Sequence, residues 1–311
     1  MNWKTIGVAA TGEEVDGLET MLWESGAVSV TLVDGEDKPI FEPGPGETPL
    51  WPSMTVTAMY EEDIDTDSLA ESLRGQGYEV LFTDEIGDRV WEREWLSQFK
   101  PMKFGEHLWV CPTGFTVDDT AAVILHLDPG LAFGTGTHPT TGLCLEWLDG
   151  HLIPGTRVLD YGCGSSILGI AAKLLGARDI IAVDNDPQAL VATEDNAQRN
   201  GVQDDILTYL PDGFLAERAA SDPVEPENGQ PAPPFAEKAA GQFDIVVANI
   251  LAQPLINLAY QLSSYVAPGG DLVLSGIMSS QSDWVKKAYQ LELLAEQELD
   301  GWICLHFKKP L

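Results

Sequence analysis

Residues 158–166 read Val-Leu-Asp-Tyr-Gly-Cys-Gly-Ser-Ser, and residues 181–184 read Ile-Ala-Val-Asp. Each stretch contains an apolar strand that ends in a carboxylate, and the first continues through a glycine turn into a helical pattern. Glycines at such a turn let a ligand approach the backbone closely, and the second carboxylate can bind both hydroxyls of a ribose. This layout predicts a nucleoside site at the carboxyl ends of parallel strands.

The glycine spacing separates two classes of nucleoside cofactor. The dinucleotide motif G-x-G-x-x-G requires a glycine three residues after Gly164, and Ile167 occupies that position. An acid two residues before the first glycine, here Asp160 before Gly162, fits the loop that binds S-adenosylmethionine better. We therefore expect S-adenosylmethionine as the cofactor, and a nicotinamide-dependent oxidoreductase is the alternative.

The patterns on either side of the glycine turn predict two domains, and 311 residues are enough to bury two cores. Residues 1–87 show the order strand, helix, strand, strand, helix, strand, which is typical of a small ferredoxin-like α+β domain. We expect a connector helix and linker at residues 88–104. The second domain, residues 105–311, alternates strands and helices from about Thr156 onward, which predicts an α/β doubly wound, Rossmann-like sheet.

The expected strands are short apolar runs bounded by turn residues. In the first domain they lie at residues 6–9, 28–33, 54–60 and 79–82. In the second domain they lie at residues 158–161, 180–183, 206–210, 243–248 and 271–275, with a closing pair at 292–299 and 302–308. Residues 219–241 are rich in Pro, Ala, Glu and Gly and have almost no periodic apolar residues, which predicts a disordered surface insertion.

The formal net charge of −32 argues against direct nucleic-acid binding, because Lys and Arg make the contacts to phosphate. Such a field attracts a basic protein partner, although simple solubility explains the charge equally well. No apolar run approaches the roughly 20 residues that span a bilayer, and no secretory leader is visible. The four cysteines and five histidines show no metal-ligand spacing. We expect a cytoplasmic protein without a membrane segment or a metal.

Two further stretches have the composition of a ligand site. Asn249 ends an apolar strand, so its side-chain oxygen and neighbouring carbonyls could accept hydrogen bonds from an amine, or it could merely cap the next turn. Residues 134–137, Gly-Thr-Gly-Thr, offer many backbone donors but lack the lysine and spacing of a phosphate-binding loop. His138 could act as a base, but a histidine before a proline more often has a structural role.

Residues 127–141, 160–166, 184–187 and 249–251 together resemble the bacterial methyltransferases of large-subunit ribosomal protein eleven, the PrmA family. The resemblance covers essentially the whole chain. It implies a class I S-adenosylmethionine-dependent protein N-methyltransferase that acts on lysine and/or α-amino groups of a basic ribosomal protein of the large subunit. It also implies that residues 1–87 recognise this protein and that the connector lets the two domains reorient. We expect a monomer.

The resemblance also assigns roles to particular residues. The residues implied to contact the cofactor are Thr141, Gly162, Asp184 and Asn249, with Asp160 and Gly164 completing the glycine loop, and the residues implied to cover it are Phe133, Gly134, Thr135, Gly136 and Thr137. We expect Asn249 to orient the amine, and no strong base is assigned. Two features depart from the family: Ser166 stands where a third glycine is usual, and the insertion at residues 219–241 is long.

Two other functions remain as alternatives. Methyltransferases that modify a glutamine amide of a translation factor are similar, but they have Asn-Pro-Pro-Tyr where residues 249–252 read Asn-Ile-Leu-Ala. The missing aromatic speaks against a planar amide substrate. A non-catalytic module that binds protein through its acidic surface is the second alternative, and the retained glycine loop, Asp184 and Asn249 argue against it.

Overall fold

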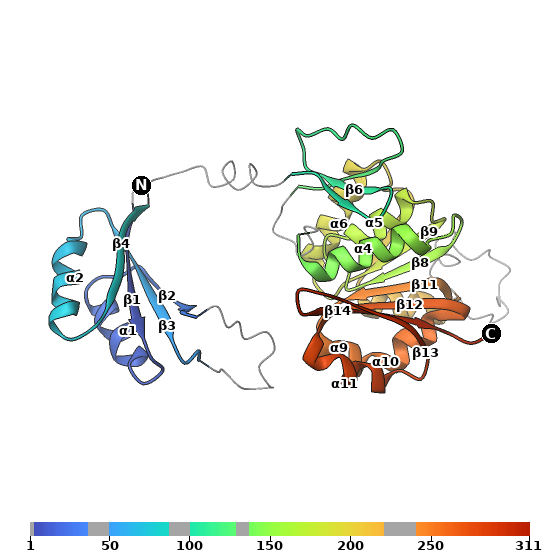
Figure 1. Cartoon of the computed structure of the whole chain (residues 1–311). Coiled ribbons are helices and arrows are strands. Elements are labelled where there is room, and N and C mark those ends of the chain that lie inside the picture. Colours follow the sequence, from blue (N-terminus) through green and yellow to red (C-terminus); the bar gives the residue numbers. More distant parts are fainter. Residues whose placement is uncertain (1–2, 37–49, 87–99, 129–136, 221–240) are drawn as a thin grey trace. The chain divides into compact units, whose positions relative to one another are not determined.

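A computed structural model of the chain describes residues 3–36, 50–86, 100–128, 137–220 and 241–311. The chain forms two compact units, Met1–Glu94 and Trp95–Leu311, and each is considered by itself (Figure 1). The predicted connector overlaps residues 87–99, which lie outside the described residues, as do residues 221–240 of the predicted insertion. Among the described residues, no helix is long and apolar enough to cross a membrane.

The described part of the first unit is a four-stranded antiparallel sheet with two helices. Its elements are β1 (Trp3–Ala10), α1 (Val15–Glu24), β2 (Ser29–Asp34), β3 (Met54–Glu61), α2 (Thr66–Gly75) and β4 (Val80–Ile86). The strand order β2-β3-β1-β4 and the βαββαβ sequence of elements are those of the predicted ferredoxin-like unit. Alternate residues of β3 are buried with Leu18 and Leu22 of α1, as a half-covered strand requires.

The described part of the second unit contains the elements of the doubly wound sheet and three further short strands. They are β5 (Met102–Phe104), β6 (Leu108–Cys111), β7 (Val123–His126), α4 (Pro139–His151), β8 (Arg157–Tyr161), α5 (Ile167–Leu174), β9 (Asp179–Val183), α6 (Pro187–Arg199), β10 (Ile206–Tyr209), α7 (Pro211–Ala220), β11 (Phe243–Asn249), α9 (Ala252–Asn257), α10 (Ala259–Tyr265), β12 (Val266–Met278), the 3-10 turn η1 (Ser279–Gln281), α11 (Ser282–Ala288), β13 (Glu292–Leu299) and β14 (Trp302–Lys308). Residues 219–220, expected in the insertion, belong instead to the end of α7.

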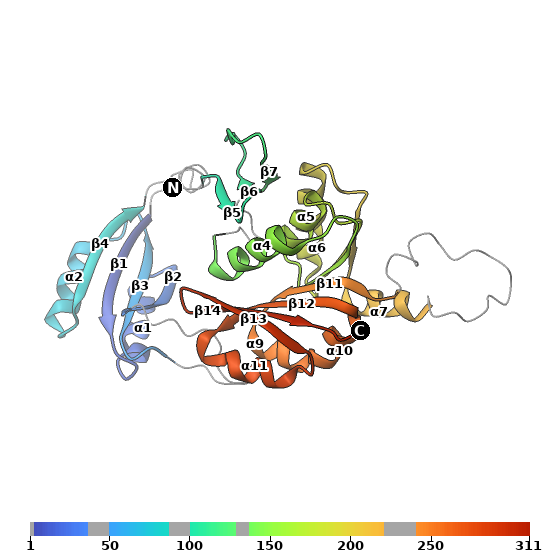
Figure 2. The same ribbon diagram turned by 45° about the vertical axis from the view of Figure 1, so that its right-hand side comes forward.

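The central sheet has seven strands in the order β10-β9-β8-β11-β12-β14-β13. The first five strands are parallel, and the closing strands β14 and β13 are antiparallel. Figures 1 and 2 show α4, α5 and α6 along one face of this sheet and α9, α10 and α11 along the other. This arrangement confirms the predicted Rossmann-like fold class.

Burial on both faces explains why the parallel strands read as continuous apolar runs. In β8, Val158 packs into the core on the side of α4 and α5, and Leu159 packs into the core on the side of α9 and α10. Ile180 and Ile181 of β9 divide in the same way. Strand order reverses between β8 and β11, so their carboxyl ends form the crevice where such folds bind ligands.

A second, three-stranded sheet in the order β5-β6-β7 was not predicted from the sequence. Its β5–β6 turn is held against α4, because the Asp149 carboxylate accepts hydrogen bonds from the backbone N–H groups of Glu106 and Leu108. Met102 to Phe104, which fall in the predicted linker, are part of this sheet. The three strands of the small sheet lie between Met102 and His126, before α4 in the chain.

Candidate cofactor and active site

The turn after β8 is shaped by three left-handed residues. Gly162, Gly164 and Ser166 have φ angles of 75°, 55° and 52°. The Gly162 and Cys163 N–H groups both donate to the carbonyl of Val183, at 2.7 and 3.1 Å, which fastens the turn to the end of β9. A Cβ atom at Gly162 would overlap Cγ2 of Ile250, so only glycine fits there.

Asp160 lies beneath this turn and not on its surface. Its side chain is 1% exposed, and Oδ2 accepts hydrogen bonds from Ser166 Oγ at 2.9 Å and from Gly169 N at 3.0 Å. Burial raises the pKa of Asp160 to about 7, even though the two hydrogen bonds favour the charged form. The carboxylate therefore braces the turn and the first turn of α5. Direct contact of Asp160 with a cofactor stays a prediction.

Ser166, the predicted departure from the family pattern, occupies a position that favours glycine. Its backbone is left-handed, with φ 52° and ψ 35°, and its side chain is fully buried. The hydroxyl is directed to Asp160, and Gly169 provides the room, because a Cβ atom at Gly169 would lie 2.5 Å from Ser166 Oγ. The side chain at residue 166 is thus accommodated below the loop.

Asp184 and Asp186 divide the roles that the sequence suggests. Asp186 Oδ1 accepts from Gln188 N at 2.9 Å and caps α6, whose first residue is Pro187. Asp184 Oδ2 instead accepts from Gly164 N at 2.8 Å, and its Oδ1 accepts from Asp186 N at 3.0 Å. Each oxygen of Asp184 has a second lone pair. The half-buried carboxylate therefore contacts the glycine turn, and its two oxygens can still accept hydrogen bonds from two hydroxyl groups.

Asn249 and Thr141 meet at the carboxyl end of the sheet. Asn249 is the last residue of β11, and its Nδ2 donates to Thr141 Oγ1 at 3.1 Å. Thr141 is fully buried in the first turn of α4. Asn249 Oδ1 makes no hydrogen bond within the described part of the chain. The fixed amide leaves that oxygen available to accept a hydrogen bond.

His138 has the structural role that the sequence favours. It is the N-cap of α4, and its Nδ1 lies 2.8 Å from Thr140 Oγ1. Its ring packs edge-on against Trp302, and burial lowers its pKa. Thr137 before it is exposed, while the other predicted covering residues, Phe133, Gly134, Thr135 and Gly136, lie outside the described residues. In the described chain, no group of acidic, Cys and His side chains could hold a metal ion.

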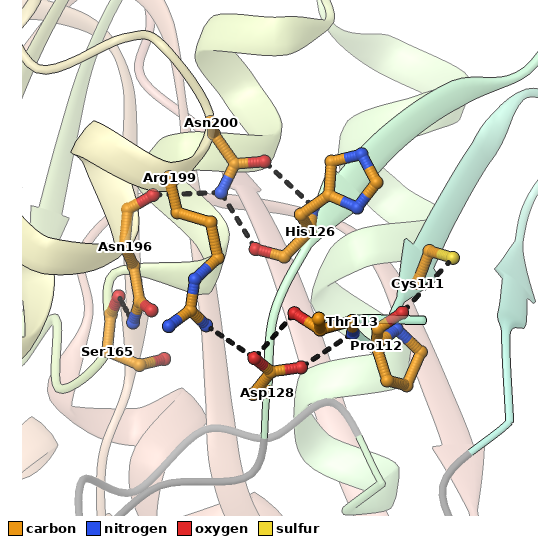
Figure 3. A network of polar contacts seen from close by, with 9 residues as sticks. All are labelled: Cys111, Pro112, Thr113, His126, Asp128, Ser165, Asn196, Arg199 and Asn200. Carbon is orange, nitrogen blue, oxygen red and sulfur yellow. Dashed lines mark hydrogen bonds and ion pairs between the residues drawn. The ribbon is translucent and has the colours of Figure 1, made fainter. Parts of the chain in front are cut away.

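The sequence did not indicate the contacts that α6 makes with the glycine turn. Thr193 Oγ1 donates to the Gly164 carbonyl at 3.0 Å, and Asn196 Nδ2 donates to the Ser165 carbonyl at 3.2 Å. One observation could have found them: Thr193 is a polar residue in the buried stripe that Ala189 and Ala197 define at four-residue spacing. Figure 3 shows Asn196 pointing at Ser165, with further polar contacts between the end of α6 and the segments around β7.

Together, a glycine turn at the switch point of a doubly wound sheet, a carboxylate after the next strand and an asparagine after β11 define a Rossmann-like methyltransferase. The family model described as ribosomal protein L11 methyltransferase (PrmA) matches residues 2–310. The chain therefore belongs to the ribosomal protein L11 methyltransferase (PrmA) family. It is an enzyme that uses S-adenosylmethionine, and the predictions of family and cofactor are confirmed.

Individual relatives agree with this membership. The chain is 46% identical to a ribosomal protein L11 methyltransferase of Methylococcus capsulatus, over 97% of this chain and 98% of the relative. It is 47% identical to the enzyme of the same description from Azotobacter vinelandii, with the same coverage. A crystal structure of a ribosomal protein L11 methylase from Lactobacillus delbrueckii subsp. bulgaricus is 29% identical and has a TM-score of 0.55, covering 68% of this chain and all of that one.

Proposed function

We propose that the enzyme transfers methyl groups from S-adenosylmethionine to lysine and/or α-amino groups of ribosomal protein L11. The observation that supports an amine as the methylated group is the fixed orientation of the Asn249 amide. Its nitrogen is held by Thr141 and its oxygen is left as an acceptor, and the next residue, Ile250, packs against Gly162 of the glycine turn. An amine has N–H groups to donate to that oxygen, and no planar ring or amide has to be stacked.

The residues of the crevice suit the cofactor. The left-handed glycines, with no room for a side chain at Gly162, allow close approach to the backbone. Asp184 has two oxygens that can accept from ribose hydroxyls, and it is oriented by Gly164 N and Asp186 N. We assign Thr141, Gly162, Gly164 and Asp184, with Asn249, to the cofactor site. The covering role of residues 133–137 remains part of this proposal.

The proposed methyl transfer does not require a strong catalytic base. S-adenosylmethionine supplies a methyl group on a positively charged sulfur, and the acceptor amine must be neutral to attack it. Lysine has an ordinary pKa of about 10.4, and a desolvated pocket lowers that pKa by disfavouring the cation. Asp160 is buried under the turn and His138 caps α4, so neither is assigned as a base. Asn249 and nearby carbonyls contribute by aligning the amine.

The proposed partner is basic and the enzyme is acidic. A net charge of −32 attracts a cationic ribosomal protein and disfavours direct contact with nucleic acid. We assign recognition of the protein to the ferredoxin-like domain, residues 1–87. The predicted linker at residues 88–104 ends earlier than expected, because Met102–Phe104 belong to the small sheet of the methyltransferase unit. The sequence-based expectation of a monomeric, cytoplasmic enzyme belongs to the same proposal.

The test is mass spectrometry of purified ribosomal protein L11 after incubation with the enzyme and S-adenosylmethionine. We expect added methyl mass, and peptide mapping should place it on lysine side chains or the α-amino group. The Asn249→Ala variant, which lacks the amide that aligns the amine, should add much less methyl mass. Methyl groups on a glutamine amide would favour the alternative acceptor, and no added mass would overturn the substrate assignment.

A further inference from the structure

Helix α6 holds two successive carbonyl groups of the glycine turn. Thr193 and Asn196 lie three residues apart, so their side chains share one face of the helix. Thr193 donates to the Gly164 carbonyl and Asn196 to the Ser165 carbonyl. Because the peptide unit is planar, holding a carbonyl also sets the direction of the next N–H group. The helix thereby fixes the peptide planes that form the floor of the predicted cofactor site.

The C-terminal end of α6 is fastened to β7 by Asn200. Its Oδ1 accepts from His126 N at 2.8 Å, and its Nδ2 donates to His126 O at 2.8 Å. The same Nδ2 donates to the main-chain carbonyl of Asn196 at 2.9 Å. Both polar atoms of this half-buried amide are therefore engaged, and they tie strand β7 to the residue that holds Ser165 (Figure 3).

A neighbouring ion pair supports the same connection. Arg199 Nη1 lies 3.2 Å from Asp128 Oδ2, and Asp128 also accepts from the N–H and hydroxyl groups of Thr113, at 2.6 and 2.7 Å. Asp128 follows β7 in the chain and precedes α4, which presents Thr141. Figure 3 shows two groups of contacts, one from Thr113 through Asp128 to Arg199 and one from His126 through Asn200 and Asn196 to Ser165. Arg199 and Asn200 are neighbours at the end of α6, so both groups join the region of the small sheet to the helix that holds the glycine turn.

We propose that Asn196 and Asn200 are positioning residues for the cofactor: Asn196 sets the glycine turn, and Asn200 sets Asn196 against β7. The proposal rests on the proposed function, because it takes the turn at residues 162–166 as the cofactor site. Neither side chain has to touch the cofactor. The effect is transmitted through the Ser165 carbonyl, so removal of either amide loosens the turn and weakens cofactor binding.

The experiment is calorimetric titration of the full-length enzyme with S-adenosylhomocysteine, for the wild type and for Asn196→Ala, Asn200→Ala and the double variant. Each single replacement should raise Kd about tenfold, as loss of one hydrogen bond typically does. The double variant should bind only slightly more weakly than either single one, because the two amides act through one contact. Gln198→Ala is the matched control, since Gln198 is an exposed amide on the same helix.

Two further measurements separate positioning from a structural role. The KM for S-adenosylmethionine should rise in both single variants while the KM for the ribosomal protein stays unchanged. Hydrogen exchange of the backbone amides at residues 164–167 should accelerate in Asn200→Ala, which is distant from them along the chain. A merely structural staple would lower the melting temperature and leave Kd, measured well below that temperature, equal to that of Gln198→Ala. That result would overturn the proposal.

The conservative variant Asn200→Asp keeps the test decisive if the alanine variant does not fold. It retains an oxygen for His126 N but places a second oxygen against the carbonyls of His126 and Asn196, so Kd should still rise. An unchanged Kd in Asn200→Asp would contradict the inference. If the wild type itself does not bind S-adenosylhomocysteine, the assignment of the cofactor site fails. If the wild type binds and the variants bind equally well, the cofactor site stands and only the positioning role of Asn196 and Asn200 fails.

Discussion

The side-chain nitrogen of Asn249 lies 3.1 Å from the hydroxyl oxygen of Thr141, although 108 residues separate the two along the chain. The contact joins the end of β11 to the first turn of α4 and determines which way the asparagine amide faces. A free amide could rotate and donate a hydrogen bond from its NH2 group to the lone pair of the amine, which would then be unavailable to attack the methyl group. Thr141 therefore sets the orientation of the Asn249 oxygen that accepts a hydrogen bond from the amine, and it takes no part in the methyl transfer itself.

Thr141→Val should reduce kcat because it removes the acceptor for Asn249 Nδ2 while keeping the shape of the side chain. We expect a loss of roughly 10- to 100-fold, the scale on which misalignment slows an oriented reaction. Asn249→Ala should lose at least as much. Steady-state kinetics with ribosomal protein L11 measures both, and a double variant no slower than Asn249→Ala would show that the two residues act together. Fully additive losses would contradict this coupling.

Asp184→Ala should weaken binding of S-adenosylhomocysteine by roughly 1–3 kcal/mol, because two hydroxyl groups lose a charged acceptor. Asp184→Asn keeps one oxygen and should fall between the wild type and the alanine variant. The control is Asp195→Ala, which removes an exposed carboxylate from α6. Calorimetry gives the dissociation constants, and equal constants for Asp184→Ala and the control would refute the ribose assignment.

Ser166→Gly should lower stability slightly at pH 8. Glycine relieves the left-handed backbone, worth about 1–2 kcal/mol, but the buried Asp160 carboxylate loses a charge-assisted hydrogen bond worth about 1.5–3 kcal/mol. Ser166→Ala keeps the strain and loses the bond, so it should be clearly less stable than Ser166→Gly. Urea unfolding gives the order. An alanine variant as stable as the wild type would mean that the hydroxyl contributes nothing.

The stability of the enzyme should depend on pH through Asp160. Its pKa in the folded chain is about 7, above its ordinary value of 3.8, so between these values the folded state binds more protons than the unfolded state. The free energy of unfolding therefore falls as pH rises through this window, because the buried carboxylate becomes charged. Asp160→Asn should remove that part of the slope. Parallel urea titrations from pH 4 to 8 compare the two proteins, and identical slopes would exclude Asp160 as the cause.

Replacement of residues 221–240 by a short Gly-Ser linker should leave the melting temperature and turnover nearly unchanged. The composition of this segment predicts no contribution to a core. A short linker suffices because Arg218 Nη1 donates to the Gly241 carbonyl, which brings the two ends of the segment together. Calorimetric melting and kinetic assays provide the test, and a large loss in either would show that the segment has structure or function.

The sequence predicted elements whose pattern is local. The closing strands β13 and β14 were predicted with their observed bounds, because turn residues flank both. The small sheet escaped prediction because β5, for example, has only three residues, Met102–Phe104, which are too few for alternation to be visible. Its strands form by pairing with segments elsewhere in the chain, and a local sequence pattern does not predict such pairing.

The same distinction applies to the site. Asp184 and Asn249 follow strands, so their places at the carboxyl edge could be read from the chain. Asn196 and Asn200 could not, because a half-buried polar residue on a helix shows its partner only when the packing of that helix is known. The burial of Asp160 was also invisible, since an acid at the end of a strand can face the ligand or the core.

The contact of Asn200 with His126 also affects the exposed edge of the small sheet. Among the described residues, strand β7 lies at the edge of its sheet and pairs with β6 alone. An edge of this kind exposes backbone N–H and C=O groups to which a strand of another molecule can add. Asn200 occupies the N–H and the C=O of His126 with its own amide, as a neighbouring strand would. A single side chain thus occupies the backbone groups of His126 that a strand of another molecule would otherwise pair with.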